Sequence, residues 1–214
     1  MPITKKNGFT LVEIAIALVI VGLLTSGALV GQEMVTNAKL KRIESNNAGI
    51  AAAIFSYQDR YLRLPGDDSG AKTRFSIYTD TINDPAAADI NGDSSGSIDG
   101  SWLGAANSET SNVWKHLRAA GLIPGSGDDD TQPPNAFGGT IGLRDGSLLI
   151  AGHVLVCSYI EGPVAKILEH RLDDGVPATG RVQSDISAAL MDGTNISSSA
   201  NYVDSLRYFM AFRL

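Results

Sequence analysis

Apolar residues are distributed very unevenly along this chain of 214 residues. Between Phe9 and Val30 most positions are apolar, and Glu13 carries the only charge. This stretch exceeds the roughly 20 residues that a helix needs to cross the hydrocarbon core of a bilayer. We therefore expect a membrane-spanning helix near the N-terminus and a folded domain in the rest of the chain.

The same helix is expected to continue beyond the bilayer. No proline occurs between Pro2 and Pro65, so no residue in this interval lacks the N–H group that a helix requires. Past residue 40 the apolar positions narrow to one stripe at helical spacing, which is typical of an amphipathic helix packed on a domain. Pro65 and Gly66 then predict the end of the helix. The stripe comprises Ile43, Ile50, Ile54, Tyr57 and Tyr61.

Two shorter helices are predicted further along the chain. Ser111 or Asn112 is expected to cap a helix over residues 113–120, because both side chains accept hydrogen bonds from the free N–H groups of a first turn. Pro163 suits the first turn of a second helix over residues 163–172.

Short runs of β-branched and aromatic residues predict an antiparallel sheet. The expected strands lie at residues 140–144, 147–152 and 153–160, with a turn at Asp145-Gly146 and a half-buried terminal strand within residues 202–214. Together with the N-terminal helix these strands predict an α+β fold, in which a long helix packs on a small antiparallel sheet.

Charge and cysteine content narrow the range of functions. The formal net charge is −6, and because an acidic surface repels polyanions we expect no direct binding of nucleic acid. Lys5 and Lys6 precede the apolar run, so the positive-inside rule places the N-terminus in the cytoplasm and the remaining chain outside. Cys157 is the single cysteine, which excludes an internal disulfide and a zinc site built from several cysteines.

The segment "KKNGFTLVEIAIALVIVGLL", residues 5–24, resembles the class III leader and N-terminal helix of bacterial type IV pilins and pseudopilins. The resemblance implies that a prepilin peptidase cuts between Gly8 and Phe9 and that the new amine of Phe9 is methylated. It also implies that Glu13 pairs with the Phe9 amine of a neighbouring subunit. Such pairing is physically sound, because two opposite charges removed from water stabilise each other.

The resemblance extends into the folded domain. The stretch "YLRLPGD", a loop rich in Gly and Asp, and "VWKHLRAAGLIPG" are similar to a subset of pilin-like proteins. The implied fold is the pilin-like fold. The implied organisation is a leader at residues 1–8, a transmembrane half of the helix at 9–31, an amphipathic half at 32–63 and a globular α+β head at 64–214.

The resemblance implies a structural subunit rather than an enzyme. The precursor would span the inner membrane once and then polymerise as a homo-oligomer into a helical filament, with the help of an inner-membrane assembly platform and its ATPase. The filament would be an extracellular pilus or a periplasmic pseudopilus, serving adhesion, motility, DNA uptake or secretion.

Three alternatives to a major pilin remain open. A minor pilin or a type II secretion pseudopilin would share every N-terminal feature. A signal-anchored periplasmic protein that binds calcium or carbohydrate would retain its first eight residues and would not polymerise. A cleaved secretory signal peptide fits less well, because its apolar region is shorter and ends in a small-residue cleavage site.

Calcium is the only cofactor that the sequence suggests. Residues 67–100 are rich in Asp, Gly, Ser and Asn, and oxygen-bearing residues alternate within them as in the first half of a calcium-binding loop. Ser94 stands where such a loop has Gly, and Gly100 stands where it has a bidentate Glu, so a solvated turn is the alternative. The candidate ligands are Asp89, Asn91, Asp93, Ser95 and Asp99.

No pattern in the sequence is typical of a catalytic site. His116, His153 and His170 show no metal-binding spacing, and Cys157 lies in no nucleophile motif. Asp173 and Asp174 form a second oxygen cluster, which the turn at the end of a helix explains adequately.

Overall fold

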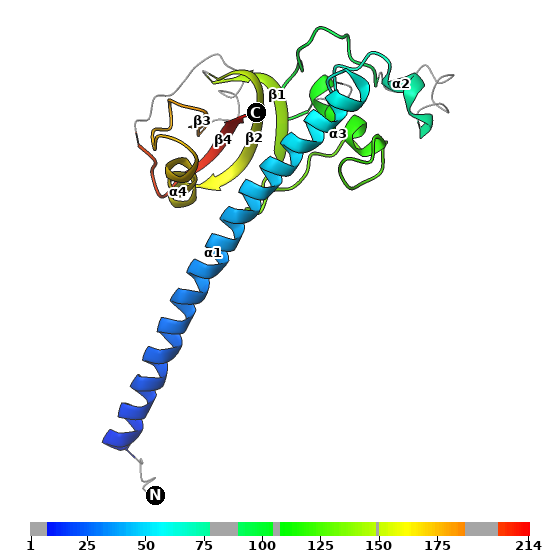
Figure 1. Ribbon diagram of the computed structural model, residues 1–214. Helices are drawn as coiled ribbons and strands as arrows, with labels where there is room; N and C mark the ends of the chain where they lie inside the picture. The colour runs from blue at the N-terminus through cyan, green and yellow to red at the C-terminus, as the bar shows by residue number, and fades with distance from the viewer. Residues whose placement is uncertain (1–7, 78–89, 105–107, 149, 187–200) are drawn as a thin grey trace, which may run out of the picture. The chain divides into compact units, whose positions relative to one another are not determined.

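The computed structural model describes residues 8–77, 90–104, 108–148, 150–186 and 201–214 (Figure 1). The protein has the predicted α+β architecture, with a long N-terminal helix and a small antiparallel sheet. Its helices are α1 (Leu11–Tyr61), α2 (Ala71–Arg74), α3 (Glu109–Ala119) and α4 (Gly162–Leu172). Its strands are β1 (Ile141–Ser147), β2 (Ile150–Glu161), β3 (Val182–Asp185) and β4 (Arg207–Arg213).

Helix α1 belongs to two compact units, residues 1–39 and residues 40–214. Within the first unit no described side chain is buried, whereas burial begins at Leu40 in the second. The predicted apolar stripe is confirmed: Ile43, Ile50, Ile54 and Tyr57 are buried and Tyr61 is half-buried. The helix ends at Tyr61, before Pro65 is reached, because Leu62 adopts the left-handed conformation with φ 54°.

The sheet has the strand order β1-β2-β4-β3, and every neighbouring pair is antiparallel. Leu155 in β2 pairs with Phe212 in β4, and Phe212 pairs in turn with Val182 in β3. Helix α4 packs against β2, β3 and β4 (Figure 1).

Both faces of the sheet are covered. One face joins the buried stripe of α1, helix α3 and helix α4 in the main core, to which Trp114, Leu117 and Met210 belong. The opposite face packs against Trp102, which is 1% exposed, together with Phe209. Neighbouring residues of a strand point to opposite faces of the sheet, so Met210 and Ala211 can both be buried only because both faces are covered.

The predicted turn at Asp145-Gly146 is wrong. Strand β1 continues to Ser147, which pairs with Ile150, and the chain reverses after Leu148. Gly146 has φ +65°, but this conformation belongs to an irregularity in the ladder between Asp145 and Ser147. The two segments expected at 147–152 and 153–160 therefore form one strand, β2.

The predicted cap of the helix near residue 113 is also wrong. The cap is Ser108, whose Oγ accepts a hydrogen bond from the N–H of Ser111 at 3.3 Å, and the helix begins at Glu109. Ser111 and Asn112 lie inside the first turns and are buried. Helix α4 begins at Gly162 with Pro163 in its first turn, which confirms that prediction. Strand β3 was not predicted.

Candidate functional site

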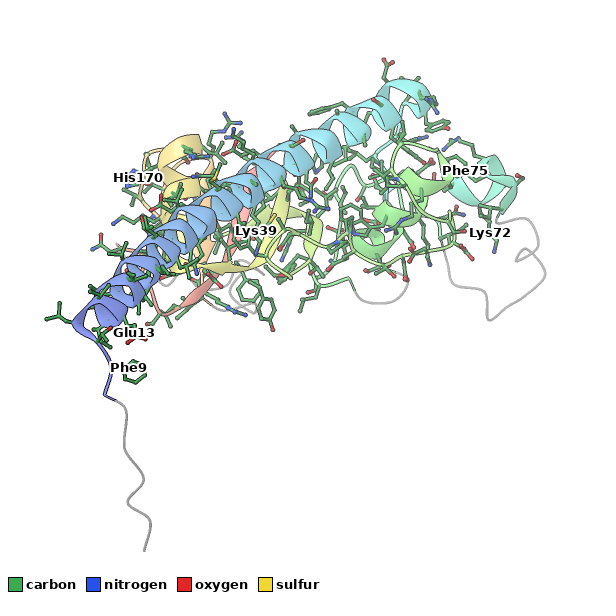
Figure 2. The ribbon with its side chains drawn as sticks, turned by 90° about the horizontal axis from the view of Figure 1, so that it is seen from below. Phe9, Glu13, Lys39, Lys72, Phe75 and His170 are labelled. Atoms are coloured by element: carbon green, nitrogen blue, oxygen red, sulfur yellow. The ribbon has the colours of Figure 1, made fainter. Side chains whose placement is uncertain are left out.

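The N-terminal segment places the predicted processing and assembly residues next to one another. Gly8 and Phe9 precede α1 and are exposed, and Glu13 lies in the first turn of the helix (Figure 2). The Glu13 Oε2 accepts hydrogen bonds from the Thr10 N–H at 2.9 Å and from the Thr10 Oγ1 at 2.8 Å. The Thr10 Oγ1 accepts a hydrogen bond from the Glu13 N–H at 3.3 Å in return.

This reciprocal arrangement is a capping box. A Thr at the cap position and a Glu three residues later satisfy two N–H groups that the first turn of any helix leaves free. The negative charge of Glu13 also lies at the positive end of the helix dipole. Thr10 was not predicted as a functional residue, although the spacing Thr-x-x-Glu before an apolar run is the known sequence sign of a capping box.

The first part of α1 presents apolar side chains in every direction. Leu11, Leu18 and Leu23 are 86%, 67% and 70% exposed. An 18-residue window of α1 has a mean hydropathy of 2.4 and is 0% buried within the molecule. By length and composition this part of α1 fits a membrane span, with Glu13 as its only charge between Phe9 and Val30.

The acidic loop, residues 90–100 of the head, is hydrogen-bonded to the turn that follows α1. Asp68 is fully buried and accepts hydrogen bonds from the Tyr57 hydroxyl at 2.7 Å and the Gly70 N–H at 2.9 Å, and it pairs with Arg74. Asp67 accepts hydrogen bonds from two N–H groups of the loop, those of residues 95 and 96. The two aspartates of "LPGDD" therefore hold the loop in place.

His116 on helix α3 also connects this turn to the start of the loop. Its Nδ1 accepts a hydrogen bond from the Gly66 N–H at 2.9 Å, and its Nε2 lies 2.7 Å from the carbonyl oxygen of Ile90. The first bond requires an unprotonated Nδ1, so the neutral ring with a proton on Nε2 satisfies both partners. Burial lowers the pKa of His116 to about 4.

Three carboxylates meet where the loop approaches helix α3. Asp67, Asp93 and Glu109 each offer an oxygen within 4.8 Å of the other two. Burial raises the pKa of Glu109, and the negative charges of Asp67 and Asp93 raise it further. Hard cations such as Ca²⁺ take carboxylate oxygens of this kind, so the three residues fit a divalent cation by donor type.

The same carboxylates also serve the backbone of the loop. The Glu109 side chain accepts hydrogen bonds from the N–H groups of Asp93 at 3.0 Å and Asp99 at 2.8 Å. Hydrogen bonding from Ser95 lowers the pKa of Asp93. A network of this kind stabilises an irregular loop without any ion.

The predicted calcium ligands do not all meet at this cluster. Asp93 is a member, whereas the Asn91 Oδ1 accepts a hydrogen bond from the Lys72 N–H at 2.9 Å. The Ser95 Oγ accepts a hydrogen bond from the N–H of residue 97 at 3.3 Å, and Asp99 contributes its own N–H to Glu109. Asp89 lies outside the described residues.

Asp67 and Glu109 were missed by sequence reasoning. They come from the turn after α1 and from the start of α3, far along the chain from Asp93. Glu109 directly follows Ser108, the cap of α3, and an acidic residue at that position indicates a helix start rather than a ligand.

Cys157, His116 and His153, which were considered for catalysis, have contacts that indicate structural roles. Cys157 is fully buried, and burial raises the pKa of its thiol to about 12, so it is not a nucleophile at neutral pH. His116 is engaged as described, and the His153 Nδ1 lies 3.4 Å from the Asp145 Oδ1.

The chain matches the family described as the prokaryotic N-terminal methylation motif over residues 3–29. No curated protein and no solved structure matches it. The matched residues include Gly8, Phe9 and Glu13, which the structure places at the start of an exposed apolar helix. The chain therefore carries the type IV prepilin signature, and its N-terminal segment is that of a pilin-like or pseudopilin precursor.

Proposed function

We propose that this protein is a structural subunit that polymerises through the N-terminal part of α1 into a type IV pilus-like filament. The observation that carries the proposal is the exposed apolar surface that begins at Leu11 and continues beyond the matched motif, with Glu13 as its only charge up to Val30. A soluble protein rarely exposes so large an apolar surface unless a membrane or a partner covers it.

Two environments can cover that surface in succession. Lipid covers it in the precursor, because α1 is long enough to cross the bilayer. Neighbouring copies of the same helix cover it in the filament, where small residues allow close approach. Gly22, Gly27 and Gly31 lie in this part of α1, and a Cβ at each would meet nothing within 4 Å. These glycines are therefore free to serve contacts between subunits.

Cleavage between Gly8 and Phe9 creates the charge that assembly must pair. It removes the leader with Lys5 and Lys6 and creates a positive amine on Phe9. Inside a bundle of apolar helices this amine needs an acceptor, and the Glu13 carboxylate of an adjacent subunit supplies one. On this proposal a prepilin peptidase processes the chain, and an inner-membrane platform with its ATPase extracts it into an extracellular pilus or a periplasmic pseudopilus.

Mass spectrometry of the mature N-terminus, combined with electron microscopy of sheared cell-surface material, tests the proposal. We expect a chain that begins with methylated Phe9, together with thin fibres that contain it. Gly8→Asp should retain the leader and yield no fibres. A side chain at position 8 meets nothing within 4 Å, so this loss would reflect recognition by the peptidase rather than misfolding.

Gly49→Ala is the matched control. It also lies in open space, within α1 but outside the matched motif, and it should be processed normally. A wild-type chain that keeps residues 1–8 and stays monomeric would overturn the proposal in favour of a signal-anchored protein. Fibres confined to the periplasm would support a pseudopilin.

We also propose that the carboxylates of Asp67, Asp93 and Glu109 bind calcium. The specific observation is that three carboxylate oxygens lie within 4.8 Å of one another, where a cation would relieve their mutual repulsion. Calorimetric titration of the full chain in detergent should show calcium binding that Asp93→Asn weakens by at least tenfold. Titrations of wild type and Asp93→Asn that coincide would show that the loop is held by its hydrogen bonds alone.

A further inference from the structure

Glu169 on helix α4 is a fully buried carboxylate with one unpaired oxygen. Its Oε2 accepts a hydrogen bond from the Tyr202 hydroxyl at 2.9 Å, and the Tyr202 oxygen accepts one from the Ser184 Oγ at 2.8 Å. Its Oε1 has no hydrogen-bond partner among the described residues. A buried acceptor without a partner is costly, and more so when it is charged, so this oxygen requires a partner.

Two nearby carboxylates destabilise the ionised form of Glu169. Asp173 and Asp174 follow directly after α4, and one oxygen from each lies within 4.8 Å of a Glu169 oxygen. Burial disfavours the charged form of Glu169, and the negative charges of the two aspartates act in the same direction. The Tyr202 hydrogen bond acts in the opposite direction but does not compensate.

The two aspartates are held in fixed positions by the loop that leads to β3. The Asp173 Oδ2 accepts hydrogen bonds from the N–H groups of Arg181 and Val182, the second at 2.7 Å. The Asp174 Oδ1 accepts one from the N–H of residue 176 at 2.8 Å, and its Oδ2 accepts one from the Thr179 hydroxyl at 2.6 Å. Both side chains are therefore held in place as hydrogen-bond acceptors.

We propose that Glu169, Asp173 and Asp174 together bind one calcium ion. Calcium takes oxygen ligands at about 2.3 to 2.6 Å, so two ligands on opposite sides of the ion lie up to about 5 Å apart, which matches the spacing of the three oxygens. Glu169, whose Oε1 has no hydrogen-bond partner among the described residues, contributes to this cluster from the buried side, and Asp174 contributes to it from the solvent-exposed side. Water completes the coordination on that open side.

The ion would join parts of the head that are distant along the chain. Glu169 belongs to α4, Asp173 holds the backbone that enters β3, and Tyr202 leads toward β4. A cation at their junction stabilises the end of α4 and the edge strand β3 together. This site is separate from the cluster of Asp67, Asp93 and Glu109, and it does not depend on filament assembly.

The test uses the full chain in detergent micelles, treated with a chelator and then titrated with calcium chloride. Wild type should bind calcium in calorimetry, and its melting temperature should rise by about 5 to 10 °C at one hundred times the dissociation constant. Asp174→Asn removes an exposed ligand without disturbing the core and should lower the affinity at this site by at least tenfold. Glu169→Gln should do the same and should also raise the melting temperature measured without calcium.

Two control variants distinguish calcium bound at this site from calcium bound elsewhere in the head. Asp67→Asn should remove the response of the loop cluster and leave this one intact. Tyr202→Phe removes the hydroxyl partner but no ligand, so it should retain calcium binding while weakening tyrosine-sensitised terbium emission from this site, to which the neighbouring Tyr208 also contributes. Calcium binding unchanged by both Asp174→Asn and Glu169→Gln would overturn the inference. So would a wild type without any calcium response in which Glu169→Gln alone raises the melting temperature, because Glu169 would then be a buried neutral acid.

Discussion

The two parts of helix α1 use apolar residues in opposite ways. From Leu11 to Lys39 the apolar side chains point in all directions and none is buried, whereas from Leu40 to Tyr61 they form one stripe that is buried in the head. The helical backbone is continuous through both. The arrangement of apolar residues around a helix, more than their number, therefore indicates what the helix will contact. A uniform apolar surface suits lipid or identical helices, and a stripe suits one fixed partner.

The largest effect is expected at Glu13, the single charge between Phe9 and Val30. Glu13→Ala should reduce the yield of filaments by more than about tenfold, because it leaves the Phe9 amine without an acceptor inside the bundle. The melting temperature of the head and the cleavage after Gly8 should stay unchanged. Counting fibres in sheared material by electron microscopy, with immunoblotting of the membrane fraction, measures the effect.

Glu13→Gln distinguishes the two roles that the structure gives this residue. Glutamine can also complete a capping box with Thr10, but it carries no charge. We expect it to fail in assembly like Glu13→Ala. Wild-type filaments from Glu13→Gln would mean that capping of α1, rather than pairing with the Phe9 amine, is what assembly requires.

The next effect contrasts a buried leucine-sized side chain with an exposed one. Ile54 is 1% exposed, and Ile54→Ala should lower the free energy of unfolding of the head by about 2 to 5 kcal/mol, since it leaves a cavity. Leu18 is 67% exposed, and Leu18→Ala should change that free energy by less than about 0.5 kcal/mol. Thermal unfolding in detergent, followed by tryptophan fluorescence, measures both. Equal effects would refute the division of α1 into two parts.

Acid should weaken the surface against which the buried part of α1 packs. The His116 ring stacks on Tyr57 of α1 with 6.1 Å between ring centroids. Burial is the main cause that lowers the pKa of His116 to about 4. The contact with the Ile90 carbonyl opposes this shift, and the positive charges of Arg74 and Lys115 add to it. In the unfolded chain a histidine has a pKa of about 6.5.

The stability of the head should fall as the pH falls, because the folded state has the lower of these two pKa values. Above pH 6.5 neither state binds the proton, and between pH 6.5 and about 4 only the unfolded state does, so stability falls as the pH falls. The loss approaches about 3 kcal/mol at pH 4. Glu169, whose pKa is raised, contributes with the opposite sign, so the measured quantity is the difference between wild type and His116→Gln in denaturant unfolding. Parallel pH profiles of the two proteins would contradict this prediction.

The sequence was sufficient for α1 but not for the turns of the head. The absence of proline and the spacing from Ile43 to Tyr61 predicted the long helix, because both depend only on neighbouring residues. The turn was placed at Asp145-Gly146 because Gly favours positive φ, yet the chain reverses at Leu148, a residue that rarely adopts φ 54°. Strand β3 is four residues long and is held by its pairing with β4, which its own sequence does not reveal.

The candidate sites divide in the same way. Gly8, Phe9 and Glu13 are adjacent in the sequence, so their motif could be read directly. Asp93 was a predicted ligand, but its grouping with Asp67 and Glu109 could not be predicted, because these three residues come from separate segments that the folded head brings together. The role of Glu169 could not be predicted for another reason. Its hydrogen-bonded partners, Tyr202 and through it Ser184, lie in later segments of the chain.

The smallest effect is expected at helix α3, which shares a core with the buried stripe of α1. Ser108→Ala removes the cap of α3 and should lower the free energy of unfolding of the head by about 1 kcal/mol. Ser111→Ala, at the position where a cap was predicted from the sequence, removes only a hydroxyl that donates to the Ser108 carbonyl oxygen at 2.9 Å, and it should cost less. Because Trp114 and Leu117 of α3 share a core with Ile54 of α1, loosening the start of α3 should reach the buried part of α1. Hydrogen exchange should therefore speed up for amides near Ile54 in Ser108→Ala and remain unchanged near Leu18, and faster exchange at both places would show that the two parts of α1 do not respond separately.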